Sequence, residues 1–449
     1  MKKFLIFFVL WLGFSAGMLP AQNPIIRNQF TADPTARMFN GRVYLFPSHD
    51  IKVPEGTNLR KDWFCMADYH VFSSENMTDW TDHGVIVSQG KVPWVDSTSY
   101  SMWAPDCVER NGKYYFYFPA NKSTAGPNGR KGFGIGVAIA DKPEGPYIPQ
   151  SEPIKGIAGI DPNVLIDKDG QAYIYWSMGN IFVAKLKENM VELDSEPLAI
   201  PDLPTKGLKE GPWAFERNGL YYLTFPHVEN KIERLEYAMS NSPLGPFKMT
   251  GVIMDESPLN CWTNHHSLIE KDGQWYLFYH QNEYSPKFDK NRSACIDSLF
   301  FNADGTIRKV VPTFRGVGLS SAIEKIEIDR YSLKSGSGVS VAQLDVDYPF
   351  AGWKAILDKP DTWIQYNSVD FGCNKPKSVL VNASSKTDGI LEVRLNKFDG
   401  PLVAKIKLRK GDGWQLSKAK IAGLPIGVAN LIVIPRCENP VSIDWLKFE

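Results

Sequence analysis

Three acidic residues and one histidine stand at corresponding points of a pattern that recurs along the chain. Asp33 and Asp161 each precede a proline, Glu210 stands directly before Gly211-Pro212, and His265 opens the last copy. An aspartate before a proline often serves only as a turn former that bonds its own backbone. Because three carboxylates recur at equivalent points of three copies, we interpret them as a set that converges in the folded chain.

Converging carboxylates have a definite use in the hydrolysis of glycosidic bonds. One carboxylic acid protonates the leaving oxygen, and a carboxylate on the other face of the sugar activates water. The acid has to stay protonated near neutral pH, so its pKa has to be raised. A neighbouring negative charge raises it, because two adjacent carboxyls do not both ionise easily. A third carboxylate can therefore tune the acid.

The elements that would position these residues form a fivefold repeat. Each copy has a polar or proline-marked start, a short apolar run, an Asn-Gly or Asp-Gly turn and a strongly aromatic strand. Both turn residues have to tolerate a positive φ, which makes this dipeptide a strong hairpin signal. The turn glycines are Gly41, Gly112, Gly170, Gly219 and Gly273. A second strand pair follows each hairpin, so the pattern predicts an all-β, five-bladed β-propeller, with a multi-sheet sandwich as the alternative.

A propeller would place the repeated residues together. The first strand of each blade is a natural candidate to line the central channel, so the starts of the five copies would ring one mouth of that channel. The ring positions are Asp33, Ala104, Asp161, Gly211 with Glu210 just before it, and His265.

The repeat fades after Pro312, and the character of the chain changes from about Ser320. Short alternating strands separated by Gly, Pro, Asn and Asp turns follow, which is typical of an all-β sandwich. Those strands are residues 363–366, 378–381, 391–395, 431–434 and 441–445. We therefore expect a propeller over residues 24–320 and a β-sandwich over residues 321–449.

The N-terminus has the pattern of a signal peptide over residues 1–21. Lys2 and Lys3 precede an apolar stretch over residues 4–14, and Ala21 offers a cleavage site before Gln22. A buried N-terminal helix is the alternative. The pattern predicts a protein exported to the periplasm or the outside of the cell, with no membrane anchor after cleavage. Export permits disulfides, but none of the six cysteines forms a CxxC pair, and we favour buried free thiols without zinc.

Charge and composition narrow the class of partner. Lys plus Arg and Asp plus Glu each number 50, so the formal net charge is zero. A nucleic-acid binder or a polybasic membrane-surface protein would show a basic excess. Aromatic residues make up 12% of the chain, and aromatic platforms beside polar groups suit neutral ligands such as sugars.

Residues 24–315 resemble glycoside hydrolase family 43 through an ordered set of short segments. These segments are Asp33-Pro34, Trp103-Ala104-Pro105-Asp106, Gly159-Ile160-Asp161-Pro162, Lys209-Glu210-Gly211-Pro212, His265-His266-Ser267 and Arg292-Ser293-Ala294-Cys295. The resemblance implies a five-bladed propeller and an inverting mechanism. It would make Asp33 the general base that activates water and Glu210 the general acid, with Asp161 raising the pKa of Glu210 and orienting it.

The same resemblance implies three further roles. Trp103 would form the aromatic wall of the sugar pocket, or belong only to a blade core. Arg292 would contact the terminal sugar and the carboxylates, or end a solvated strand. His265 would face the channel and support a hydrated, structural calcium on the propeller axis, or be a structural histidine. The resemblance implies no cofactor required for the chemistry.

The C-terminal region resembles a family 6 carbohydrate-binding module in four runs. These are residues 361–366, 369–372, 411–415 and 443–448. The resemblance implies a jelly-roll core, with Trp414 as the candidate sugar platform. Ser442 stands where that family commonly has a sugar-binding asparagine, so a purely structural sandwich is an equal alternative.

Together these features predict an exported, inverting glycosidase that releases arabinofuranose or xylose from plant polysaccharides or oligosaccharides. A glycosidase of other specificity, such as a galactosidase, stays open. A retaining fructosidase-type enzyme would carry Asp-Pro-Asn, whereas Thr35 follows Asp33-Pro34 here. A non-catalytic sugar-binding propeller would have no need of a matched acid and base.

Overall fold

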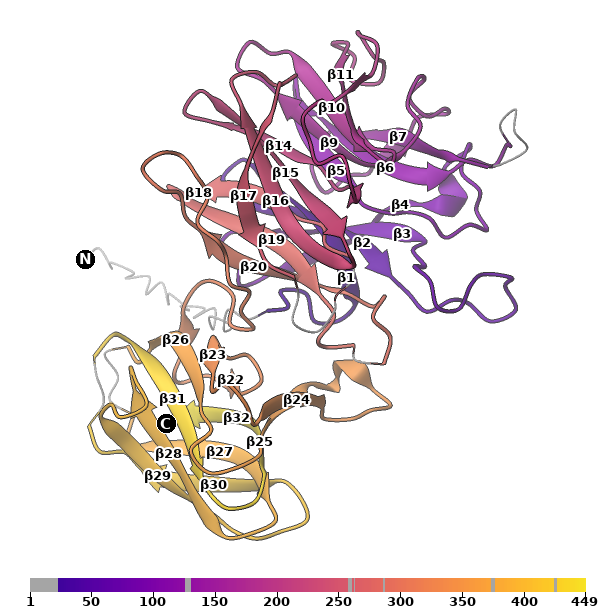
Figure 1. The fold of residues 1–449 in the computed structure, drawn as a ribbon. Coiled ribbons are helices and arrows are strands. Elements are labelled where there is room, and N and C mark those ends of the chain that lie inside the picture. Colours follow the sequence, from indigo (N-terminus) through magenta and orange to yellow (C-terminus); the bar gives the residue numbers. More distant parts are fainter. Residues whose placement is uncertain are drawn as a thin grey trace, which may run out of the picture.

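The structure is a computed structural model that describes residues 23–125, 131–256, 261, 263–285, 287–372, 376–423 and 426–449. The predicted signal peptide and Cys373 lie outside the described residues. Figure 1 shows two β-rich units, a larger one at the N-terminal side and a smaller one, orange to yellow, at the C-terminal side. The only helical elements among the described residues are two short 3₁₀ turns, η1 (Gln89–Lys91) and η2 (Pro349–Ala351). Within those same ranges, no helix has the length and apolar character of a membrane span.

The N-terminal unit consists of five antiparallel sheets that follow one another along the chain, which confirms the predicted propeller. The first sheet contains β1 (Phe30–Phe39), β2 (Arg42–Asp50), β3 (Asp68–Ser74) and β4 (Thr81–Ser88). The second contains β5 (Asp106–Arg110), β6 (Lys113–Asn121), β7 (Phe133–Ala140) and β8 (Ile148–Pro149). The third contains β9 (Ile160–Ile166), β10 (Ala172–Ser177), β11 (Ile181–Leu186) and β12 (Leu198–Ala199).

The last two sheets depart from the expected four strands per blade. The fourth has β13 (Leu208–Lys209), β14 (Trp213–Arg217), β15 (Leu220–Glu229), β16 (Ile232–Ser240) and β17 (Lys248–Met254). Its first strand is divided by Glu210-Gly211-Pro212, so β13 and β14 both pair with β15. The fifth has only β18 (Ser267–Lys271), β19 (Gln274–Gln281) and β20 (Ser293–Leu299). The start of the described chain lies beside β20, where the Ile25 N–H donates to the Ala294 carbonyl at 2.9 Å.

The first strands of the blades lie around the propeller axis. Strand β1 contacts β5 and β18, and β9 contacts β5 and β14. Hydrogen bonds between blades lock this inner ring: the Thr35 hydroxyl donates to the Pro105 carbonyl and the Ser267 hydroxyl donates to the Pro34 carbonyl, both at 2.6 Å. The buried Asp106 carboxylate pairs with Arg37 at 2.6 Å. The proline-marked starts therefore hold the blades together as well as ringing the channel.

The predicted turn chemistry is confirmed in four of the five hairpins. Both turn residues have positive φ at Asn40-Gly41, Asn111-Gly112, Asn218-Gly219 and Asp272-Gly273. The third hairpin differs, because Ile166 pairs with Ala172 and leaves a five-residue loop. There only Gly170 has a positive φ, of 84°, and its N–H donates to the Asp167 carbonyl at 2.9 Å. A longer loop needs one left-handed residue rather than two.

The C-terminal unit is a sandwich of two sheets. One sheet contains β21 (Ser320–Ser321), β23 (Leu333–Lys334), β26 (Ile364–Asp370), β31 (Val428–Arg436), β28 (Gly389–Leu395) and β29 (Leu402–Leu408). The other contains β22 (Ile326–Glu327), β24 (Val339–Gln343), β25 (Trp353–Leu357), β32 (Val441–Phe448), β27 (Ser378–Ser385) and β30 (Gln415–Lys420). One apolar core fills the space between them. The expected division at residue 320 falls within β21, which pairs with β26.

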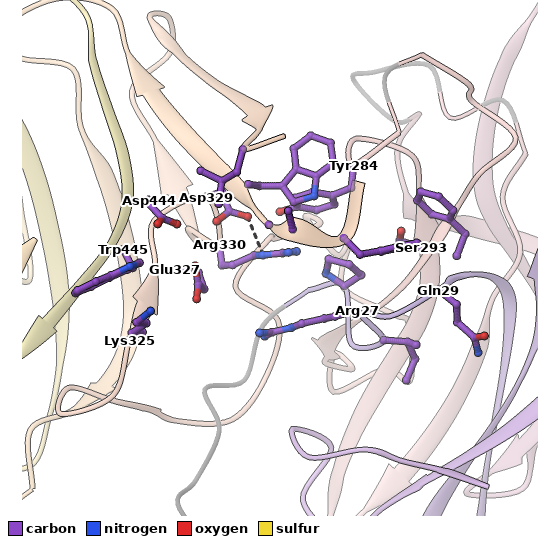
Figure 2. Close-up of a pocket in the computed structure, with 18 residues that line it drawn as sticks. Arg27, Gln29, Tyr284, Ser293, Lys325, Glu327, Asp329, Arg330, Asp444 and Trp445 are labelled. Atoms are coloured by element: carbon purple, nitrogen blue, oxygen red, sulfur yellow. Dashed lines mark ion pairs between the residues drawn. The ribbon is translucent and has the colours of Figure 1, made fainter. Parts of the chain in front are cut away.

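A charged cavity of about 240 Å³ lies where the two domains meet. Figure 2 shows Arg27 of the propeller side near Glu327, Asp329 and Arg330 of the sandwich side. The Arg330 guanidinium lies 4.1 Å from the centre of the Tyr284 ring. Burial and the charges of Asp329 and Asp444 raise the pKa of Glu327 to about 7. The three predicted catalytic carboxylates do not line this cavity.

The five cysteines in the described part of the chain are free and buried, as expected: Cys65, Cys107, Cys261, Cys295 and Cys437.

Candidate active site

Local breaks in the inner strands position the three carboxylates. The register of β1 against β2 shifts between Ala32 and Thr35, and Asp33 lies in that bulge with a φ of 47°. Asp161 has a φ of 56° beside a similar shift between β9 and β10. A bulge re-aims a side chain out of the regular strand, and aspartate tolerates the left-handed conformation better than most residues. The proline-marked starts are therefore bulges that turn these carboxyls out of the sheets.

In the fourth blade, Gly211 forms the break in the first strand, directly after Glu210. Its φ is 54°, and a Cβ atom there would lie 2.8 Å from Nδ1 of His265 and 3.2 Å from the Pro226 ring. Only glycine fits this close approach. The Gly211 N–H donates to Oδ2 of Asp161 at 2.9 Å. The segment that carries Glu210 is thus held between Asp161 of the third blade and His265 of the fifth.

Asp33 is buried and held in its ionised form. Its carboxylate lies 2.9 Å from the Arg292 guanidinium and accepts a hydrogen bond of 2.5 Å from the Ser48 hydroxyl. Burial alone would raise the pKa of Asp33. Arg292, His265, His280 and Ser48 outweigh it and lower the pKa to about 2.

Arg292 is clamped between two buried carboxylates. Its Nε and Nη2 donate to the two oxygens of Asp50, each at 2.9 Å, while Nη1 donates to Asp33. Burial would lower the pKa of Arg292, but the charges of Asp33 and Asp50 raise it above its ordinary value. A bidentate pairing of this kind fixes the plane of the guanidinium. Arg292 is therefore a permanent cation beside Asp33, not the end of a solvated strand.

Glu210 and Asp161 have raised pKa values. Burial and the charge of Asp33 raise the pKa of Glu210 to about 7, against the opposing charge of Arg292. Burial, the Glu210 carboxyl and Asp33 raise the pKa of Asp161 well above its usual range. Two carboxyls that repel each other in this way share a proton and titrate as a pair. The site thus contains one carboxylate kept ionised and a pair that keeps a proton near neutral pH.

The two buried histidines beside Asp33 are neutral. Burial lowers the pKa of His265 to about 4 despite the charge of Asp33. Burial and Arg292 lower the pKa of His280 to about 3. The Asp33 N–H donates to Nδ1 of His280 at 3.1 Å, and Nε2 lies 2.5 Å from the Thr263 carbonyl. His280 is therefore fixed as the tautomer that carries its proton on Nε2, and it supports the backbone of Asp33.

Trp103 lies in an aromatic group next to the charged centre. Its ring lies 4.8 Å from Phe133 and 6.0 Å from Phe64, measured between ring centres. The Phe64 ring in turn lies 4.9 Å from the Arg292 guanidinium. Trp103 is only partly buried, although it also packs against the core between the first two blades. This position is compatible with either of the two roles that the sequence left open.

The structure also brings in residues that the sequence reasoning missed. Ser48 and Asp50 alternate along β2 and both reach the charged centre, Ser48 through Asp33 and Asp50 through Arg292. The signal in the sequence that could have indicated them is that both are polar residues at the end of the apolar run Val43–Phe46. Glu233 on β16 is buried, and burial together with the charge of Glu210 raises its pKa to about 9. No local pattern distinguishes Glu233 from a surface glutamate.

Comparison with known proteins assigns the propeller domain. The family model described as glycosyl hydrolases family 43 matches residues 21–307. A xylosidase/arabinosidase 43A of Humicola insolens is 37% identical over 334 residues, which is 63% of this chain and 98% of that protein. The chain belongs to glycosyl hydrolase family 43.

Solved structures and longer relatives agree with this assignment. A family 43 beta-xylosidase/alpha-arabinofuranosidase from a compost metagenome, solved with xylotriose in a calcium-free form, superposes with a TM-score of 0.58 at 33% identity over 64% of this chain and 97% of that chain. An arabinoxylan arabinofuranohydrolase of Paenibacillus polymyxa is 27% identical over 449 residues, which cover 88% of this chain and 68% of that protein. This family 43 enzyme is a glycoside hydrolase that acts on O-glycosyl bonds.

The sandwich of this family 43 enzyme matches the carbohydrate binding module of family 6 over residues 332–449. Trp414 precedes β30 and is 40% exposed, with the Lys354 ammonium 6.0 Å from its ring centre. Its exposure is compatible with a sugar platform. Ser442 lies on β32 and is partly buried. The expected platform is thus accessible and lies in the other domain from the charged centre.

Proposed function

We propose that the protein releases arabinofuranose or xylose from plant polysaccharides or their oligosaccharides, with inversion at the anomeric carbon. The observation that carries this proposal is that the site shifts the pKa values of two carboxyls in opposite directions. The pKa of Asp33 is lowered to about 2, while that of Glu210 is raised to about 7. An inverting glycosidase needs one ionised base and one protonated acid. The names of the relatives, xylosidase/arabinosidase and arabinoxylan arabinofuranohydrolase, support the two sugars.

Asp33 acts as the general base in this proposal. Its carboxylate accepts a proton from a water molecule while the water oxygen forms the new bond to the anomeric carbon. The Ser48 hydroxyl and Arg292 keep the carboxylate oriented. Because its pKa is low, Asp33 is a weak base that stays ionised over the working pH range, and orientation has to supply most of its effect.

Glu210 acts as the general acid. It donates its proton to the glycosidic oxygen as the bond between that oxygen and the anomeric carbon breaks. At the end of the reaction Asp33 holds the proton taken from water and Glu210 is ionised, and exchange with solvent restores both. Asp161 shares a proton with the acid and holds the Glu210 segment through the Gly211 N–H. Both proton transfers of the hydrolysis thus involve carboxyl groups of the chain.

Trp103 and Arg292 bind the sugar in this proposal. The Arg292 guanidinium lies in a fixed position beside Asp33, and the ring of Trp103, which packs near Phe64, would form an apolar face for the sugar ring. Arabinofuranose and xylose differ in ring size and in the direction of their hydroxyls. The shape of the pocket between these residues would decide between them.

We extend the proposal to a hydrated calcium ion near His265. The lowered pKa leaves the His265 imidazole neutral and able to accept a hydrogen bond from a water molecule of the ion. Asn264 Oδ1 is buried without a hydrogen-bond partner among the described residues, and oxygen atoms are the groups that calcium prefers. Bound calcium would supply positive charge that strengthens the ionised form of nearby carboxyls. A chelator should lower the temperature of unfolding of the wild type and leave that of His265→Ala unchanged.

We also propose that the protein is exported. The signal-peptide pattern over residues 1–21 supports this location, and plant polysaccharides are too large to reach an enzyme inside a cell. Mass spectrometry of the protein recovered from the periplasm or the medium should give an N-terminus near Gln22. An intact N-terminus inside the cell would refute export.

Replacing Glu210 with glutamine tests the catalytic assignment. The variant lacks the proton donor, so activity on xylo- and arabinoxylo-oligosaccharides should fall by a factor of about 10² to 10⁴. Aryl glycosides with good leaving groups should lose much less, because they need little protonation. The matched control is Glu188→Gln, which changes an exposed glutamate on the third blade.

The substrates should include aryl arabinofuranosides, xylosides and galactosides, with the anomer of the first product followed by proton NMR. Full activity of Glu210→Gln on the natural oligosaccharides would refute the assignment of the acid. Release of the retained anomer would refute inversion. Inactivity of the wild type on all three classes of aryl substrate would favour a sugar-binding propeller.

A further inference from the structure

Two histidines and two aspartates gather on one face of the first blade, outside the active site. Ser48 of β2 pairs with Tyr69 of β3, which places His49 opposite Asp68. His70 follows Asp68 by two residues and so projects from the same face of the strand. His49, Asp68 and His70 each offer one metal-binding atom, and these atoms all lie within 4.8 Å of one another.

Carboxylates already orient both rings. Nδ1 of His49 lies 2.8 Å from Oδ1 of Asp68, and Nδ1 of His70 lies 3.0 Å from Oδ1 of Asp82. The centres of the two imidazole rings are 5.3 Å apart. A carboxylate on one ring nitrogen fixes the orientation of the imidazole and makes the other nitrogen a better ligand, an arrangement common around metal ions in proteins. Asp82 therefore leaves Nε2 of His70 as the nitrogen available to a metal.

We propose that His49, Asp68 and His70 bind a divalent transition-metal ion, with Zn²⁺ as the expected ion and Asp82 as the partner that orients His70. Two imidazoles and one carboxylate form a nitrogen-rich set that suits zinc better than calcium or magnesium, which prefer oxygen ligands. The side chains of His49, Asp68 and His70 are 20%, 23% and 15% exposed, so an ion can enter from solvent and leave a position for water.

Because this cluster lies on two neighbouring strands, a bound ion would also affect the stability of the first blade. A metal held by His49 and Asp68 links β2 to β3. Asp50, the next residue of β2, points away from the cluster and clamps Arg292. The ion would therefore stabilise the strand whose opposite face positions the active-site cation.

The test measures zinc bound per chain after equilibrium dialysis of the full-length protein, together with the visible absorption of bound Co²⁺. The wild type should bind one zinc ion more than His49→Ala and His70→Ala, and both variants should lose the Co²⁺ band of a nitrogen-containing site. Zinc should raise the unfolding temperature of the wild type more than that of either variant. His83→Ala is the matched control, because His83 lies on β4 of the same blade and contacts Ser73 at 2.8 Å.

His83→Ala should behave like the wild type in all three measurements. Zinc binding near His265, if it occurs, would remain in every one of these variants and would not mimic the expected loss. Equal zinc content in the wild type and His70→Ala would overturn the proposal. Failure of the wild type to bind zinc at the cluster in dialysis would overturn it as well.

Discussion

Replacing Asp161 with asparagine removes one ionisable carboxyl from the buried pair that Asp161 forms with Glu210. The amide keeps an oxygen that can accept the hydrogen bond of 2.9 Å from the Gly211 N–H, so the backbone around Glu210 should hold its place. In the wild type, loss of the last proton of the pair leaves two negative charges side by side. In Asp161→Asn, loss of the proton of Glu210 leaves only one negative charge. The proton should therefore be lost at a lower pH.

The size of the effect follows from the surroundings of the two carboxyls. Burial and Asp33 raise the pKa of Glu210 to about 7, and the repulsion between the two carboxyls appears in the raised pKa of Asp161. Burial and Asp33 remain in Asp161→Asn, so only the part due to this repulsion should disappear. We expect the alkaline limb of the pH profile to move down by about one pH unit, which corresponds to about 1.4 kcal/mol in the free energy of deprotonation.

The assay is kcat/KM between about pH 4 and about pH 9 on a natural oligosaccharide, because kcat/KM reports the ionisation of the free enzyme. A substrate with a poor leaving group is needed so that the acid limits the rate. Asp169→Asn is the matched control, since it makes the same chemical change at an exposed turn of the same blade. An alkaline limb that stays in place or moves to higher pH in Asp161→Asn would refute the proton-sharing argument.

Three further predictions concern residues around this centre and in the sandwich. Asp50→Asn leaves the buried Arg292 with one charged partner instead of two and should lower the free energy of unfolding by about 3–5 kcal/mol, measured by urea denaturation; an unchanged midpoint would contradict the clamp. Glu233→Gln should keep near-wild-type kcat/KM at pH 7, because a pKa of about 9 means that the carboxyl is already neutral there; a large loss would show that the charged form is needed. Trp414→Ala should weaken retention by arabinoxylan in affinity gels. Phe398→Ala should not weaken it, although Phe398 is as exposed as Trp414, at 39% against 40%. Equal retention of the two variants would contradict the role of Trp414 as a sugar platform.

The sequence predicted the fold and the three carboxylates because both follow from local rules that repeat. Asn-Gly or Asp-Gly turns and aromatic strands recur five times, proline-marked strand starts recur four times, and a repeat of this kind needs no knowledge of distant contacts. The same repetition placed Asp33, Asp161 and Glu210 at equivalent points. The turn at Asp169-Gly170 shows the limit of the argument, because the dipeptide sits in a five-residue loop that only the strand register reveals.

Tertiary structure alone decided the electrostatic character of the site. Asp33 and Asp161 have the same local sequence, an aspartate before a proline, and similar positive φ values. Their pKa values move in opposite directions because Arg292, 259 residues further along the chain, lies beside one of them, whereas Glu210 lies beside the other. Local sequence sets the backbone that turns a carboxyl toward the channel. The charge of that carboxyl depends on which side chains the closed ring of blades brings against it, and those come from distant parts of the chain.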